Sequence, residues 1–155
     1  MVKVPTRSPT HEDIEMRRLA SMGLELEEIA VDGGDQQAVP LPALIELAED
    51  RGRPPSHYLA AIPLATELTV DCAPAAPSLT AKVCAGNCQR YGALDILDHL
   101  VTRWVAKPSF RIAPVECLDR CDLGPALELH GDHGVLVLSP ATAATLDEAL
   151  ASLGG

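Results

Sequence analysis

The sequence predicts an α/β protein in which a helical N-terminal part precedes a small sheet covered by helices. Two patterns support this fold class. Apolar residues recur at helical spacing up to about residue 65, whereas from residue 79 onward the elements follow in the order strand, helix, strand, strand, strand, helix. The connector Cys72-Ala-Pro-Ala-Ala-Pro separates the two patterns. We therefore expect an N-terminal arm and helical extension at residues 1–75 and a second domain at residues 76–155.

Three helices are expected in the N-terminal part, after an arm that contains prolines. Their apolar stripes are Ile14, Leu19 and Met22 in the first, Leu44, Ile45 and Ala48 in the second, and Tyr58, Leu59 and Ile62 in the third. Breaking residues set the expected boundaries: Gly23 ends the first helix, Pro42 opens the second, Gly52 ends it and Pro63 closes the third. Gly33-Gly34-Asp35 is expected to separate the first two helices.

The second domain is expected to alternate strands and helices. The predicted elements are a strand at 79–83, a helix at about 89–105, a strand at 110–115, a strand around Leu127 and Leu129, a hairpin turn at 131–134, a more buried strand at 135–138 and a last helix opened by Pro140. The first two strands each run towards a pair of cysteines. The first helix of this domain is expected to begin beside Cys88.

The bulk composition limits the function classes. The chain has 155 residues with 12 Lys plus Arg against 22 Asp plus Glu, a formal net charge of −10, and no basic block, so we expect no nucleic-acid partner. No apolar run is long enough for a spanning helix and the first ten residues do not resemble a signal peptide, which predicts a cytoplasmic chain without membrane insertion. Five cysteines in such a chain favour metal or redox chemistry over a disulfide framework.

Four of the cysteines form two pairs, Cys84/Cys88 and Cys117/Cys121, with three residues between the members of each pair. Because each pair follows a predicted strand, the four sulfurs can converge over one end of a sheet if those strands are neighbours. Four thiolates are the usual ligands of an iron–sulfur cluster. A four-cysteine zinc site is the first alternative, although it is typical of modules that need metal to fold. Reactive thiols or disulfides are the second, although they more often show the spacing Cys-x-x-Cys.

Other residues with metal or charge chemistry have simpler interpretations. Cys72 is unpaired by spacing and is expected to be a small buried residue or an inert thiol. His130 and His133 flank a predicted turn and are expected to be solvated, so a Rieske-type centre is set aside. The acidic run Glu46, Glu49, Asp50 is expected to be a solvated helix face that could also attract basic partners. No Ser/His/Asp grouping, phosphate-binding glycine loop or paired-carboxylate motif indicates a hydrolase or transferase.

The cysteine segments resemble a known family. Lys82-Val83-Cys84, then Cys88-Gln89-Arg90-Tyr91-Gly92-Ala93, then Val115-Glu116-Cys117-Leu-Asp-Arg-Cys121-Asp-Leu-Gly-Pro-Ala126, with Ser139-Pro140 further on, are similar to the thioredoxin-like 2Fe-2S ferredoxin family. Its members include the small NADH-dehydrogenase subunit of respiratory NADH:quinone oxidoreductase and the equivalent subunits of NAD-linked formate dehydrogenases and hydrogenases. The resemblance implies a thioredoxin-like 2Fe-2S ferredoxin domain preceded by an N-terminal helical extension.

The same resemblance implies the function. Cys84, Cys88, Cys117 and Cys121 would ligate one 2Fe-2S cluster in a non-catalytic electron-transfer subunit of an NAD(P)-linked oxidoreductase. FMN and NAD would belong to a partner subunit that exchanges single electrons with the cluster, alongside other iron–sulfur subunits. The alternatives are a free-standing 2Fe-2S ferredoxin or redox sensor, and a zinc-stabilised interaction domain. The first pair is one residue closer than is usual in the family and Asp119 replaces a common glycine, which favours a relative in a hydrogenase or formate dehydrogenase.

Overall fold

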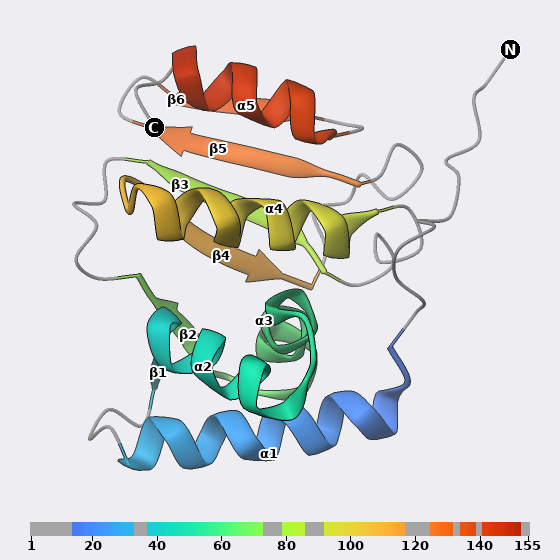
Figure 1. Cartoon of the computed structure of the whole chain (residues 1–155). Coiled ribbons are helices and arrows are strands. Elements are labelled where there is room, and N and C mark those ends of the chain that lie inside the picture. The colour runs from blue at the N-terminus through green and yellow to red at the C-terminus, as the bar shows by residue number, and fades with distance from the viewer. Residues whose placement is uncertain are drawn as a thin grey trace, which may run out of the picture.

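The computed structural model describes residues 14–32, 37–72, 79–85, 92–116, 125–131, 134–138 and 141–152, and it is a mixed α/β structure (Figure 1). Its helices are α1 (Met16–Asp32), α2 (Leu41–Arg51), α3 (Pro55–Ala65), α4 (Ala93–Ala106) and α5 (Ala143–Ser152). Its strands are β1 (Ala38–Pro40), β2 (Thr69–Asp71), β3 (Thr80–Cys84), β4 (Arg111–Val115), β5 (Leu127–Gly131) and β6 (Gly134–Leu138). The predicted order of elements from β3 to α5 is confirmed.

The larger sheet has the strand order β4-β3-β5-β6. β3 pairs with β4 in parallel and with β5 in antiparallel orientation, and β5 pairs with β6 in antiparallel orientation. The parallel pair is connected through α4, because parallel neighbours need a crossover connection. The predicted hairpin is confirmed by the pairing of Gly131 with Gly134, whereas Asp132 and His133 lie outside the described residues.

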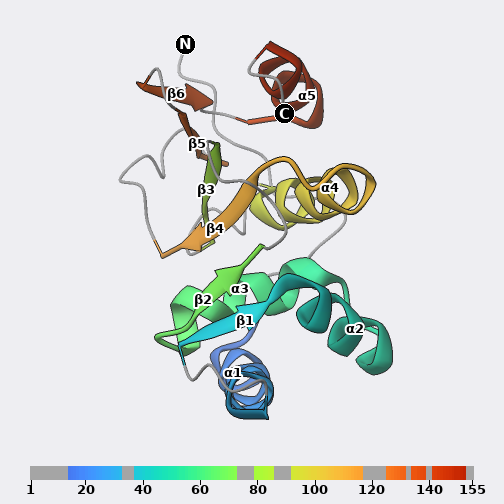
Figure 2. The same ribbon diagram turned by 90° about the vertical axis from the view of Figure 1, so that its left-hand side faces the viewer.

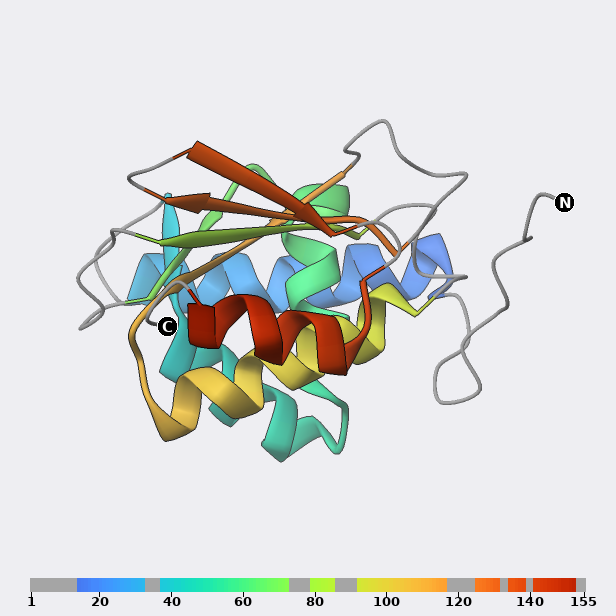
Figure 3. The ribbon, with the colours of Figure 1, turned by 90° about the horizontal axis from the view of Figure 1, so that it is seen from above.

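Both α4 and α5 lie on one face of this sheet (Figures 2 and 3). The side chains that alternate towards this face are buried, among them Ala81 and Val83 of β3 and Leu127 and Leu129 of β5. Thr80 and Lys82 of β3, on the opposite face, are only partly buried. α5 begins with a reciprocal pair of hydrogen bonds in which the backbone N–H of Thr145 donates to the Thr142 hydroxyl and the backbone N–H of Thr142 donates to the Thr145 hydroxyl.

The sequence prediction that Gly23 ends the first helix is wrong, because α1 continues to Asp32. Leu26 and Ala30 extend the buried stripe beyond the glycine. A Cβ at position 23 would lie 3.1 Å from Cβ of Ala65, so the missing side chain lets α1 approach the end of α3 closely. This contact offsets the cost of about 1 kcal/mol for a glycine inside a helix. Residues 33–35, the predicted break, lie outside the described residues.

α2 starts and ends as predicted, but the prediction that Pro63 closes the third helix is wrong. α3 contains Pro63 and ends at Ala65, where the N–H of Thr66 donates to the carbonyl of Ile62. A proline removes one helical hydrogen bond, which a helix can lose near its end. The sequence pattern also missed a small parallel sheet, in which β1 before α2 pairs with β2 after α3.

The expected start of the helix in the second domain is also wrong. α4 begins at Ala93. The residue before it, Gly92, has φ 107°, which is outside the right-handed helical region, so the helix does not extend to Gly92. Residues 86–91 are not described, and the predicted boundary between residues 75 and 76 falls within the undescribed segment 73–78. Across that boundary, α3 packs against α4 and β4, and buried residues from both parts form one hydrophobic cluster.

β6 was predicted to be more buried than the other strands, and this is wrong. Val135, Leu136 and Val137 are 54%, 42% and 37% exposed, because β6 is the end strand of the sheet and pairs only with β5 in the described part. Among the described helices, none has the length and apolar character needed to cross a membrane.

Candidate metal centre

The carboxyl ends of β3 and β4 lie side by side. Their parallel register pairs Cys84, the last residue of β3, with Val115, the last residue of β4. Cys117 follows Val115 by two residues in the sequence. The two cysteine-bearing segments therefore leave the sheet from neighbouring strands at the same edge, which is the condition that the sequence pattern required for the four sulfurs to converge.

Cys84 is held on both sides by backbone hydrogen bonds. Its N–H donates to the carbonyl of Ala126 at 3.2 Å, on the β5 side, and the N–H of Ala85 donates to the carbonyl of Val115 at 2.7 Å, on the β4 side. The alternation of β3 would place Cys84 on the less buried face with Lys82, but Cys84 is only 1% exposed. Its Sγ lies 3.6 Å from the carbonyl oxygen of Glu116. The sulfur thus points towards the start of the segment that carries the second pair.

The far ends of the two cysteine-bearing segments also meet. Gly92, which follows residues 86–91, lies so close to Pro125 that a Cβ at position 92 would be 3.7 Å from Cγ of the proline. Pro125, which follows residues 117–124, is fixed in turn because its carbonyl accepts the N–H of Ala141 at 2.7 Å. Both segments therefore begin at one edge of the sheet and end within contact distance of each other.

Of the four predicted ligands, the structure describes only Cys84. Cys88, Cys117 and Cys121 lie outside the described residues, as do Gly86 and Gly124. Within the described ranges, no three His, Cys, Asp or Glu side chains converge as a metal-binding group. The donor set predicted for this edge, with one thiol from the end of β3 and three from the adjoining segments, has the chemistry of a four-thiolate site.

Cys72 occupies a different place. It is 1% exposed and follows β2, and its Sγ accepts the N–H of Ile112 at 3.3 Å, while the Ile112 carbonyl lies 3.8 Å from the same sulfur. These contacts connect the residue after β2 to the Ile112 backbone in β4, and so link the small sheet to the larger one. Burial raises the pKa of the Cys72 thiol, and the hydrogen bond to Ile112 opposes this effect. The expectation of a buried residue agrees with this environment.

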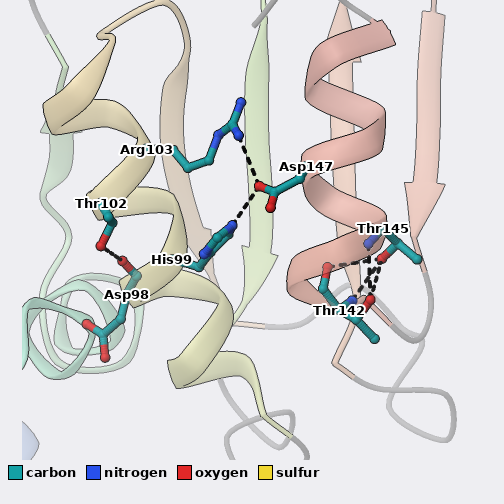
Figure 4. Close-up of polar contacts among 7 residues, drawn as sticks. All are labelled: Asp98, His99, Thr102, Arg103, Thr142, Thr145 and Asp147. Carbon is teal, nitrogen blue, oxygen red and sulfur yellow. Dashed lines mark hydrogen bonds and ion pairs between the residues drawn. The ribbon is translucent and has the colours of Figure 1, made fainter.

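The sequence analysis missed one polar cluster, which joins α4 to α5 (Figure 4). Oδ1 of Asp147 accepts a hydrogen bond from Arg103 Nη1 at 3.1 Å and lies 2.7 Å from Nε2 of His99. His99 and Arg103 are four residues apart and share a helix face, but nothing in the sequence indicates their partner on another helix. His130 is paired with Glu128 at 2.9 Å, so it is not simply solvated as expected.

Comparison of the chain with known protein families and with curated proteins found no match.

Proposed function

We propose that this chain is an electron-transfer subunit that carries one 2Fe-2S cluster on Cys84, Cys88, Cys117 and Cys121. In this proposal the chain is not itself catalytic. It exchanges single electrons with a partner subunit that binds flavin and NAD in a cytoplasmic oxidoreductase of the hydrogenase or formate dehydrogenase type.

The parallel pairing of Cys84 with Val115 carries the proposal. It gives the two cysteine pairs a common origin at one sheet edge, so short segments suffice to bring four sulfurs together, and short closures cost little chain entropy. A bound cluster would supply one-electron transfer at this edge. The chain itself would supply a buried sulfur at Cys84, with backbone fixed by Ala126 and Val115, and exclusion of water from that sulfur.

The finer fold assignment is part of the proposal. A parallel strand-helix-strand unit from β3 to β4, followed by the β5/β6 hairpin and a closing helix, is compatible with a thioredoxin-like 2Fe-2S ferredoxin domain. The helices α1 to α3 would then be the N-terminal helical extension. The packing of α3 against α4 and β4, and of α1 and α2 against α3, suits an extension that is attached to the domain rather than a separate module.

Metal analysis of protein purified without oxygen tests the proposal. We expect about two iron and two acid-labile sulfide per chain, and a visible absorption band that dithionite bleaches. Colourless protein with about one zinc per chain would contradict the cluster and support the zinc alternative. Copurification tests the partner: a flavin-containing chain in the native complex supports the subunit role, whereas a lone monomer in native extract supports the free-standing ferredoxin or redox sensor.

A further inference from the structure

An open groove of about 340 Å³ lies between α2 and the C-terminal end of α4. The cysteine edge is at the other end of α4, where the helix begins. Its apolar lining includes Pro42 and Ile45 from α2, and Val105 and Pro108 from the end of α4 and the following turn. Val105 is 62% exposed, so its side chain is available to an occupant of this groove. We call this feature the α2/α4 groove.

Two carboxylates border the α2/α4 groove. Glu46 and Glu49 both line it, and both are exposed. They are three residues apart on α2, so they lie on the same helix face. Their charge repels anions, and the formal net charge of −10 on the whole chain adds to that repulsion. A nucleic acid or an anionic lipid surface is therefore a poor occupant of the groove. A positively charged occupant is attracted to it.

The third part of the lining is a buried hydrogen-bond donor. Trp104 lines the groove, but its ring is almost fully buried, and Nε1 has no acceptor among the described residues. A buried indole N–H normally finds a partner, because an unmade hydrogen bond costs about 1–3 kcal/mol. A backbone carbonyl from an occupant of the groove would satisfy it once the Trp104 side chain turns Nε1 from its buried position towards the groove.

We propose that the α2/α4 groove binds an extended, basic segment of a partner protein that is rich in proline or aliphatic residues. Apolar side chains of the segment would pack on Ile45 and Val105, and arginine or lysine side chains would pair with Glu46 and Glu49. A backbone carbonyl would accept the Trp104 N–H. This combination of an apolar floor, an indole donor and acidic borders matches the needs of an extended peptide.

The groove leaves the cysteine edge free. α4 begins at Ala93, beside that edge, and Trp104 lies eleven residues further on, or about 16 Å along the helix axis. A segment bound in the groove would therefore not cover Cys84. The proposal does not depend on a bound cluster, because all the groups that it uses belong to α2, α4 and the turn after α4.

Fluorescence measurements on the full chain test this proposal. The probe is a short fluorescein-labelled peptide of alternating arginine, proline and leucine, and its anisotropy measures binding. We expect saturable binding with a dissociation constant on the order of 100 µM. An unlabelled peptide of the same sequence should displace the probe and lower its anisotropy. Over the same concentration range it should change the emission of Trp104, the single tryptophan of the chain. Affinity should fall as salt is added, since ion pairs at an exposed border are screened.

Charge reversal gives the matched comparison. The double variant Glu46→Lys and Glu49→Lys should bind the probe at least about tenfold more weakly. The control Glu28→Lys and Glu148→Lys changes the net charge equally at exposed sites on α1 and α5 and should retain the affinity. Trp104→Phe, checked for folding by circular dichroism, should weaken binding about fivefold, because the donor is lost.

Four outcomes of the peptide titrations would overturn the proposal. They are no binding of the arginine peptide at millimolar concentration, equal binding of a peptide with glutamate in place of arginine, full affinity in the Glu46/Glu49 double variant, and an equal loss in the control variant. Binding of anionic vesicles through the same groove would also overturn it, in favour of a membrane surface.

Discussion

The carboxylate of Asp98 on α4 caps the amino end of α3 through two hydrogen bonds to Ser56. Oδ1 accepts the backbone N–H of Ser56 and Oδ2 accepts its hydroxyl, each at 2.9 Å. α3 has no capping side chain of its own, since prolines occupy its first positions. Asp98 lies on the opposite side of α4 from His99 and its partner Asp147 (Figure 4). Asp98 thus adds a polar link between α3 and α4 to the apolar packing of α3 against α4 and β4.

Replacing Asp98 by alanine should lower the free energy of unfolding by about 2–3 kcal/mol. Ser56 is fully buried, so removing the cap leaves its backbone N–H and its hydroxyl without the Asp98 acceptors. Asp98→Asn keeps one good acceptor and should cost about half as much. Urea denaturation measures both variants. Glu28→Ala, at an exposed site on α1, should change stability by less than about 0.5 kcal/mol, and a loss at Asp98 no larger than this would refute the capping role.

Gly23→Ala should destabilise the protein, although alanine is the better helix former. The propensity gain is about 1 kcal/mol. The new Cβ, however, would lie 3.2 Å from the Ala65 carbonyl oxygen and 3.1 Å from its Cβ, neither of which can rotate away. We expect a net loss of about 1–2 kcal/mol in thermal or urea unfolding. Ser21→Ala, an exposed site on the same helix, isolates the propensity term and should be neutral or slightly stabilising. A stabilised Gly23→Ala variant would contradict this prediction and show that the end of α3 moves away from the new Cβ at little cost in free energy.

Tyr58 should make stability fall at alkaline pH. Burial, and then the Glu25 carboxylate that accepts its hydroxyl at 3.1 Å, raise the pKa of Tyr58 above its ordinary value of 10.0. The unfolded chain therefore loses this proton first, so the stability contribution is intact below about pH 10 and is lost as pH rises through the folded pKa. Tyr58→Phe should cost about 1 kcal/mol at pH 7, and its deficit should shrink above pH 10. A pH-independent difference between the two proteins would contradict this prediction.

Cys84 and Cys72 should respond differently to serine. Both thiols are buried, but Cys84 stands at the candidate metal centre, whereas Cys72 bonds to the backbone of Ile112. Under the proposed function, Cys84→Ser should lose most of the iron and visible absorbance, because serine is a poor ligand for iron. Cys72→Ser should keep both, with a stability change of about 1 kcal/mol. Equal iron content in the two variants would argue against Cys84 as a ligand.

Local signals in the sequence predicted the elements well where a residue acts through its own backbone. Pro42 and Gly52 bound α2 as expected, and Gly52 has φ 65°, the left-handed conformation of a helix end. The strands predicted at 79–83 and around Leu127 and Leu129 correspond to β3 and β5. The predictions failed at Gly23 and in β6, because the outcome there depends on a neighbour that is remote in the chain.

The candidate site divides in the same way. The sequence by itself determined that two cysteine pairs follow two strands and that a helix separates those strands in the chain. Only the tertiary structure decided that the strands are parallel neighbours with Cys84 opposite Val115, and that Gly92 and Pro125 lie close to each other. The physical reason is that spacing and periodicity act over a few residues, whereas strand pairing and helix contacts are chosen by burial of the whole apolar surface at once.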